Sequence, residues 1–421
     1  MLAATEISEA SKRRGLVSLL ITTFFMWAGF FMVIPLMSVY YVDKLGWAAA
    51  SIGLVLAIRQ FMQQGLTPIS GMLADRLGVK GLILTGVLLR VAGFASMAWA
   101  DTFPLLLFST ILAALGGSMF DSPRNAAIAV LTNKENRSRF YSLTGVVNNL
   151  GLTIGTQIGA LLLSASFGLV ALGAALCFLA TFFVTLFMLP PVRVSQRGPE
   201  EAAAGLTDGL KKALRDKPFM LYNWLLVGYW FMWVQISISL PLAAKGLGGG
   251  DETISWIFGI NAILTIALQY PLVRLASRWL RPLPTLVLGV CLMSLGLGSI
   301  ALAGSVPALM GSVVLYALGG LFASPMQQTV AAELANPRAL GSYFGVNSLA
   351  LALGGGLGNL SGGLLYDVGK QYGLHELSWL VFCVVGLASA TGLSFLASYL
   401  RRHAERQESA KKVYVEDLAG T

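Results

Sequence analysis

The sequence carries little charge. Only 12% of its 421 residues are Asp, Glu, Lys or Arg, about half of the roughly 25% found in soluble domains. The net charge is +9, but the basic residues form short runs between apolar segments and are not gathered on one surface. A soluble protein and a nucleic-acid binder are therefore both excluded as interpretations.

Cysteine and histidine are also scarce. The three cysteines lie far apart inside apolar segments, where thiols usually pack as small hydrophobic groups. The sequence contains no phosphate-binding loop, no arrangement of nucleophile and base, and no metal-ligand spacing on a polar segment. We therefore expect no enzyme activity, no cofactor and no metal site.

Long apolar runs make up most of the chain. A membrane-spanning helix needs about 20 mostly apolar residues. Twelve segments meet this requirement, near residues 16–41, 50–74, 79–100, 103–125, 138–164, 166–190, 218–245, 252–277, 283–304, 306–335, 339–367 and 376–400. The first run is longer than the 7–15 apolar residues typical of a signal peptide, so we interpret it as a retained helix. The predicted fold class is an all-α integral membrane protein with twelve transmembrane helices in two six-helix halves.

Four regions follow from this pattern. They are an N-terminal half at 1–190, a cytoplasmic linker at 191–217, a C-terminal half at 218–401 and a cytoplasmic tail at 402–421. Within the linker, Leu206, Leu210 and Leu214 recur every four residues. This spacing predicts an amphipathic helix on the inner membrane surface, with a flexible connector as the alternative.

The basic residues predict the orientation. If the N-terminus is cytoplasmic, all of them fall in cytoplasmic loops and tails except Lys44, Arg59, Arg90, Lys245 and Lys370. Loops rich in Lys and Arg are retained in the cytoplasm. We therefore expect both termini on the cytoplasmic side of a bacterial inner membrane.

The two halves repeat each other. Three glycines of the fifth segment recur 203 residues later in the eleventh, which pairs Gly151, Gly155 and Gly159 with Gly354, Gly358 and Gly362. Small residues at this spacing let membrane helices approach closely, so we expect both triplets to pack helices together. Parallel six-helix repeats are typical of secondary transporters that bind substrate at the repeat interface.

The loop after the second segment reads Gly71-Met-Leu-Ala-Asp75-Arg76-Leu-Gly78-Val79-Lys80. It resembles the signature G-x-x-x-D-R-x-G-R-[RK] of the major facilitator superfamily, and the chain is similar to this family over its whole length. The run from Gly151 to Gly159 resembles the antiporter motif of the drug:proton branch. Stretches such as Phe120-Asp-Ser-Pro-Arg124 resemble multidrug-efflux members. The resemblance implies proton-coupled export of amphipathic small molecules by a monomer in the lipid bilayer.

Two positions depart from the family pattern. The arginine expected after Gly78 is Val79, and its acidic partner corresponds to Val130, so one ion pair of the family is missing. The resemblance implies a conformational latch between the halves, which we assign to Gly71, Asp75, Arg76, Gly78 and Lys80. With the ion pair absent, we expect Asp75 to act alone by facing the positive N-terminal end of the eleventh segment.

Ionisable residues at membrane depth are rare and indicate functional sites. Arg59 and Arg90 lie in the second and third segments without a carboxylate nearby in sequence. We assign Arg59 to the substrate cavity because glutamines surround it. For Arg90, an internal role in capping carbonyl groups is the favoured alternative. The full set predicted to line the cavity is Arg59, Gln63, Asn148, Trp233, Gln235, Asn261, Gln327 and Asn347.

Two acids lie within the bundle, Asp121 and Glu333. A carboxylate that titrates between two open states can couple transport to protons, so we assign both to proton coupling. Asp121 shares a helix face with Arg124, and mutual neutralisation is the structural alternative. Three rival functions remain open: a dedicated exporter of one metabolite or siderophore, a transporter without ion coupling, and a lipid flippase.

Overall fold

The computed structural model describes residues 8–67, 69–70, 78–132, 134–191, 209–276, 278–336 and 340–419. This part of the chain folds into helices and contains no strand. In the first half of the sequence these are α1 (Glu9–Val39), α2 (Ala49–Gly65), α4 (Val79–Ser96), α5 (Phe103–Leu131), α6 (Lys134–Leu163) and α7 (Phe167–Met188). In the second half they are α9 (Lys217–Trp233), α10 (Ser239–Gly246), α11 (Asp251–Ala276), α12 (Pro282–Ser299), α13 (Val306–Leu334), α14 (Leu340–Tyr372) and α15 (Leu377–Ala419).

Most of these helices can cross a membrane. Within the described ranges, ten are long and apolar enough, and α9 with α10, bent by 43° at their junction, provide an eleventh if they form one span. The all-α membrane fold class is thereby confirmed. The short 3-10 turn η3 (Val234–Ser237) lies at the bend. Of the predicted second segment, 50–74, α2 covers the part up to Gly65, residues 67, 69 and 70 are also helical, and residues 68 and 71–74 lie outside the described residues.

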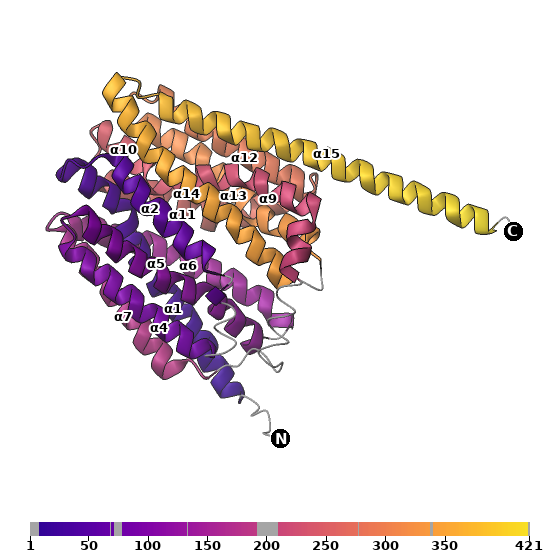
Figure 1. Cartoon of the computed structure of the whole chain (residues 1–421), viewed down its shortest axis with the longest axis horizontal. Helices are drawn as coiled ribbons and strands as arrows, with labels where there is room; N and C mark the ends of the chain where they lie inside the picture. The colour runs from indigo at the N-terminus through magenta and orange to yellow at the C-terminus, as the bar shows by residue number, and fades with distance from the viewer. Residues whose placement is uncertain are drawn as a thin grey trace.

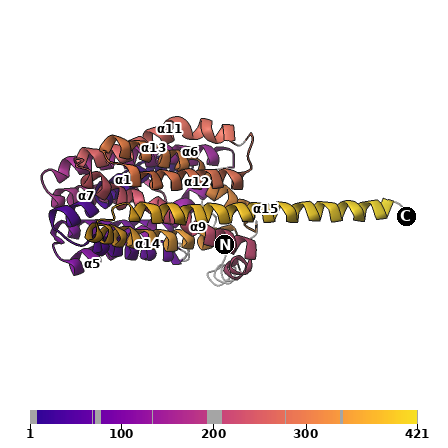
Figure 2. The same ribbon diagram turned by 90° about the horizontal axis from the view of Figure 1, so that it is seen from above.

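The last helix is longer than expected. Hydropathy predicted its end near residue 400, whereas α15 continues to Ala419 and projects well beyond the bundle (Figure 1, Figure 2). The apolar stretch therefore marks the membrane-embedded part of the helix and not its end. Of the predicted linker, residues 209–215 are helical, and 192–208 lie outside the described residues. The boundaries between the four predicted regions stay predictions.

Helices from each half of the sequence pack mainly with one another. α1 packs against α6 and α7, and α4 packs against α5 and α7; in the second half α14 and α15 pack against α9, and α12 packs against α13 and α15. The two groups are visible as the indigo-to-magenta and orange-to-yellow bundles of Figure 1. Contacts between the groups are made chiefly by α2 with α14 and by α6 with α11. We call these two contacts the seams.

The two glycine triplets occupy equivalent helix contacts. A Cβ built on Gly151 would lie 2.7 Å from the carbonyl oxygen of Phe24 on α1, and one on Gly159 would lie 2.5 Å from that of Met32. In the second half, a Cβ on Gly358 of α14 would lie 2.6 Å from the carbonyl oxygen of Phe231 on α9. The α1–α6 and α9–α14 pairs are therefore in backbone contact, where any side chain would force the helices apart.

We expect Gly155→Val to destabilise the protein, because its Cβ would overlap the backbone of Ala28. Overpacking a tight contact costs about 1–3 kcal/mol, and more where backbone must move. Gly145→Val on the same helix is the control, since a Cβ there meets nothing within 4 Å. Thermal unfolding in detergent should show a lower midpoint for Gly155→Val alone. Equal midpoints for the two variants would contradict this packing role.

Basic side chains close the C-terminal end of α7. Arg14 at the start of α1 donates through Nε to the carbonyl oxygen of Met188 at 3.2 Å and through Nη2 to that of Phe187 at 2.8 Å. Lys80 at the start of α4 donates through Nζ to the carbonyl oxygen of Leu186 at 2.8 Å. Cations are favourable at this end of a helix, where carbonyl groups lack helical partners. Three helices of the first half are thus joined at one point.

Candidate functional site

The seam between α2 and α14 is held at one end by a carboxylate. Asp367 near the end of α14 accepts hydrogen bonds from the backbone N–H groups of Ala49, at 3.0 Å, and Ala50, at 2.7 Å. These residues begin α2, so Asp367 caps its N-terminus across the two halves and faces the positive end of its dipole. Close to this cap, a Cβ built on Gly53 would lie 2.5 Å from the carbonyl oxygen of Asn359. This end of the seam is closed.

The same two helices separate toward their other end. Midway along the seam, Gly355 of α14 lies against Gln60, and the neighbouring Gly356 lies against Phe61. Beyond this point, nothing among the described residues lies within 4 Å of a Cβ built on Gly345, which is on the same face of α14 as Gly363 at the closed end. If the termini are cytoplasmic, the closed end is the outer one.

The second seam is also closed near the start of α11. The Oγ of Ser255 donates to the carbonyl oxygen of Thr156 on α6 at 3.4 Å. The rings of Phe31 on α1 and Phe258 on α11 meet edge to face, with centroids 5.8 Å apart. The two seams thus close the same end of the molecule, as a transporter requires in one of its two states.

Arg59 is buried beside the first seam. Its side chain is 8% exposed, and its Nη1 donates to Oε1 of Gln63 at 2.9 Å while its Nη2 donates to Oε1 of Gln60 at 2.8 Å. The guanidinium carbon lies 4.9 Å from the centre of the Phe30 ring. Two amide oxygens and an aromatic face therefore hold the charge, and no ion pair within the described residues neutralises it.

Arg90 lies next to Arg59, and the sequence did not predict this proximity. Its Nη2 approaches Oε1 of Gln63 at 3.5 Å, so one amide oxygen accepts from both arginines. Its guanidinium lies 5.7 Å from the centre of the Phe30 ring and 5.3 Å from that of Phe178. The Nε atoms of both arginines are buried without a hydrogen-bond partner. We call Arg59, Gln60, Gln63 and Arg90 the arginine cluster.

The arginine cluster is a costly arrangement. Two like charges close together in a low-dielectric interior repel one another, and buried charges normally require a paired counter-charge. Such an arrangement can bind an anionic group, or it can respond to the charge of a nearby acid. Asp121, one turn beyond Gly117 on α5, is an acid close to Arg90.

The two acids predicted to couple protons differ in their surroundings. Asp121 is partly exposed on α5, one turn beyond Gly117, where a Cβ would touch both Arg90 and Gln63. The proposed neutralisation of Asp121 by Arg124 is not formed. Instead, the Nη1 of Arg124 donates to the Oγ1 of Thr23 on α1 at 3.2 Å, because α1 packs against this face. Glu333 is exposed at the end of α13.

Two of the predicted cavity residues carry buried polar atoms without a hydrogen-bond partner. The Oδ1 of Asn148 on α6 and the Oε1 of Gln327 on α13 have no partner. Trp230 on α9 also buries an unpartnered Nε1 and packs edge to face on Trp233, with ring centroids 5.5 Å apart. Asn261 is partly buried on α11. The unpartnered atoms of Asn148, Gln327 and Trp230 thus have unmet hydrogen-bonding capacity within the described residues.

Two other predicted cavity residues are engaged within the protein. The Nε2 of Gln235 donates to the carbonyl oxygens of Phe231, at 2.8 Å, and Gly358, at 3.0 Å, while its Oε1 accepts from Ser239. The side chain thus joins α9 to α14 at the bend. Asn347 donates to the Oδ1 of Asn223 at 2.9 Å and joins the same pair of helices.

The structure describes only two residues of the latch predicted from the resemblance, Gly78 and Lys80. Gly71, Asp75 and Arg76 lie outside the described residues. Gly78, directly before α4, adopts φ +78°. Glycine reaches this left-handed region without the steric cost that a side chain adds. Lys80 binds the end of α7, as described above.

Sequence reasoning missed Asp367 and Phe30. Asp367 could have been found as an acid near the end of an apolar segment that runs beside the start of another helix. Phe30 gave no comparable signal, because aromatic residues are frequent throughout its segment. Its position between two arginines depends on the rotation of α1 against α2 and α4.

Known proteins have similar sequences. The Major Facilitator Superfamily profile matches residues 19–250 and 227–416. The chain is 38% identical to multidrug resistance protein MdtH of Yersinia enterocolitica over 404 residues, which cover 96% of this chain and 98% of that protein. It is also 38% identical to MdtH of Edwardsiella ictaluri over 377 residues, or 90% of this chain and 92% of the relative.

Solved structures share the fold. A nucleoside transporter, NupG, superposes with a TM-score of 0.77 at 13% identity. The superposition covers 90% of this chain and 99% of the NupG chain. A POT family transporter in complex with a thioalcohol-conjugated peptide gives a TM-score of 0.76 at 16% identity, over 92% of this chain and 96% of that one. With profile, relatives and fold in agreement, the chain belongs to the major facilitator superfamily.

Proposed function

We propose that this protein exports amphipathic small molecules in exchange for protons, by alternating access, across a bacterial inner membrane. The observation that carries the proposal is the α2–α14 seam, which is closed at Asp367 and less tightly packed at Gly345, with the buried arginine cluster beside it. A transporter that rocks about such a seam exposes its binding site to one side at a time. Both termini lie in the cytoplasm in this proposal, and the monomer is the working unit.

The relatives support the substrate class. Two proteins 38% identical to this chain are named multidrug resistance protein MdtH, and their names point to export of chemically varied compounds. The residues proposed to form the binding site are the arginine cluster with Asn148, Gln327, Asn261 and Trp233. Aromatic and apolar walls with a few polar groups suit amphipathic molecules.

Asp121 is proposed to carry the proton. Its negative charge offsets the positive charge of the nearby Arg90, so protonation of Asp121 leaves the arginine cluster less neutralised. The more positive cluster then binds a cationic amphipathic molecule less well, so a proton and such a substrate bind in alternation, as exchange requires. Proton binding and substrate binding are coupled in this way without direct contact between the two. Glu333, exposed at the predicted inner end of α13, is the second candidate, placed to exchange protons with the cytoplasm.

Inverted membrane vesicles test the proposed function. A panel of fluorescent amphipathic dyes of positive, zero and negative charge is offered to vesicles with an imposed gradient, acid inside. We expect uptake of several dyes, lost when nigericin collapses the pH gradient. Dye uptake that is the same with and without the pH gradient would contradict proton coupling. Uptake of no dye would contradict multidrug export.

The same vesicles compare the two acids. We expect Asp121→Asn to abolish the dependence of transport on the pH gradient, because its carboxylate can no longer exchange a proton. We expect Glu333→Gln to reduce the transport rate at high pH and to retain the dependence of transport on the pH gradient. Rates are measured from pH 6 to pH 9. A wild-type profile in both variants would remove both acids from the mechanism.

One observation favours a second candidate function. Two buried arginines without an ion-pair partner among the described residues suit a fixed anionic group, as in an exporter of a single acidic metabolite. That function predicts transport of one anionic class and exclusion of cationic and neutral dyes. The dye panel distinguishes it from multidrug export.

A further inference from the structure

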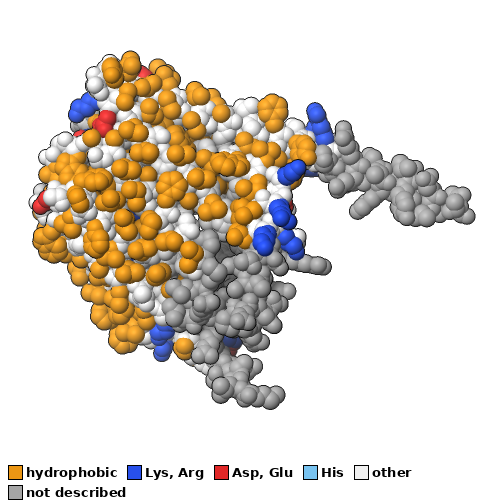
Figure 3. Space-filling view, viewed as in Figure 1, with side chains coloured by type: hydrophobic (Ala, Val, Ile, Leu, Met, Phe, Trp, Pro, Cys, Tyr) orange, Lys and Arg blue, Asp and Glu red, His pale blue; other side chains and the backbone are white. Residues whose placement is uncertain are grey.

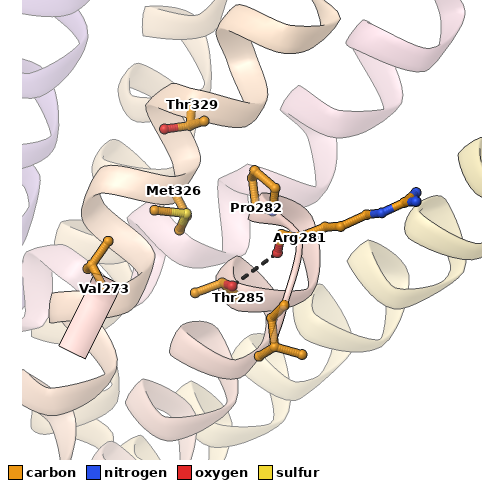
Figure 4. Close-up of a pocket in the computed structure, with 7 residues that line it drawn as sticks. Val273, Arg281, Pro282, Thr285, Met326 and Thr329 are labelled. Carbon is orange, nitrogen blue, oxygen red and sulfur yellow. Dashed lines mark hydrogen bonds between the residues drawn. The ribbon is translucent and has the colours of Figure 1, made fainter. Parts of the chain in front are cut away.

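A separate pocket lies where α11 ends and α12 begins. It has a volume of about 410 Å³, within the roughly 300–1,000 Å³ of small-ligand sites. Its wall is mainly apolar and includes Val273, Leu280, Pro282 and Met326. Figure 4 shows side chains from α11 and α13 facing the start of α12 across this space. The pocket is remote in sequence from the arginine cluster and is not used by the proposed transport mechanism.

Two arginines lie in the connection at one side of the pocket. Arg281 lines it, and Arg278 lies exposed three residues earlier in the same short connection. The backbone carbonyl of Arg281 accepts from Thr285, and its guanidinium points away from the other lining side chains (Figure 4). No acidic residue occurs in the sequence between Glu252 and Glu333. The mouth of the pocket is therefore suited to an anion.

The same connection has the composition of a membrane interface. Trp279 lies between the two arginines and is 83% exposed, a position typical of an indole at the level of lipid headgroups. On the face shown in Figure 3, basic side chains gather at the end of the molecule from which α15 projects. An apolar pocket with a basic, aromatic mouth matches the two parts of a phospholipid, an acyl chain and an anionic headgroup.

We propose that this pocket binds an anionic phospholipid. Its phosphate lies against Arg278 and Arg281, and one acyl chain enters between Val273 and Met326. Met326 follows Pro325, which lies inside α13, so the chain would contact α13 just past the position where a proline removes a helical hydrogen bond. Bound lipid would thereby hold the inner part of α13 in place.

Lipid binding is measured on the full-length protein in detergent, by native mass spectrometry and by thermal unfolding. The probes are phosphatidylglycerol, phosphatidylcholine with identical acyl chains, and glycerol 3-phosphate. We expect phosphatidylglycerol to bind and to raise the unfolding midpoint, with little effect of the other two. Equal effects of both lipids would overturn the role of charge, and an equal effect of glycerol 3-phosphate would overturn the role of the acyl chain.

Variants locate the binding. Arg278→Gln with Arg281→Gln should weaken phosphatidylglycerol binding roughly 30-fold, as expected for two basic residues near an anionic headgroup. The matched control, Lys211→Gln with Lys212→Gln, removes two exposed charges elsewhere and should bind normally. Thr329→Trp, which fills the pocket from its exposed side, should also prevent binding. Unchanged binding in the arginine or the Thr329 variant would overturn the proposal.

Discussion

Replacing Arg59 by methionine is expected to reduce transport at least about tenfold, or ~1.4 kcal/mol in the transport barrier. Methionine matches the aliphatic part of the arginine side chain and removes its charge and five donors. Gln60 then loses its partner, Gln63 keeps Arg90 alone as a donor, and Arg90 remains as the one cation of the arginine cluster. A charge maintained in the membrane interior without an ion-pair partner among the described residues is expected to serve function rather than stability.

Two measurements separate this role from a structural one. The amount of folded protein, followed by size-exclusion chromatography of a fluorescent fusion, should be close to wild type for Arg59→Met. Arg59→Lys should recover part of the transport rate, since it restores the charge without the planar fork. If Arg59→Met transports at the wild-type rate per folded molecule, Arg59 belongs to the packing of α2 and not to the site.

Replacing Asp367 by alanine is expected to shift the protein toward an outward-open state. The variant loses two hydrogen bonds from the start of α2 to a charged acceptor, each worth about 1.5–3 kcal/mol when sheltered from water. Asp367 is partly exposed, so we expect a net effect of about 2 kcal/mol, or roughly 30-fold in the ratio of the two states. Opening of the seam requires this cap to break, and its loss favours opening.

Spin labels on cysteines introduced at Leu45 and Leu374, exposed at the Asp367 end, report this shift by double electron–electron resonance. The three native cysteines are first replaced by alanine. The distance distribution of Asp367→Ala should gain a longer component, while Asp101→Ala, which removes an exposed acid from a loop, should leave it unchanged. The same distribution in both variants would show that other contacts hold the seam.

The helices of this fold could be predicted because membrane-spanning segments depend on local hydropathy. The bend at η3 could not, since Val234–Ser237 itself contains no glycine or proline to mark a break. The length of α15 was also missed, because a polar helix continues an apolar one without a change in backbone geometry. Hydropathy identifies the residues that lie in the membrane, and a helix can continue beyond the membrane surface.

The site was predicted less completely, for a related reason. Arg59 was identified by its depth in an apolar segment, but its approach to Arg90 depends on how α2 and α4 are rotated against each other. Gln235 was assigned to the cavity, yet its amide joins α9 to α14 at the bend that the sequence did not reveal. A side chain's sequence position gives its depth, and helix packing decides what it contacts.

The contacts of Arg14 and Lys80 with the end of α7 also bear on how the protein is made. Both side chains donate to carbonyl groups at residues 186–188. These residues leave the ribosome long after α1 and α4, so the hydrogen bonds form late in synthesis. The first bundle therefore gains its last internal bonds only when its sixth helix has been synthesised. It can then assemble as a unit while the second bundle is still being translated, in the order in which domains generally fold.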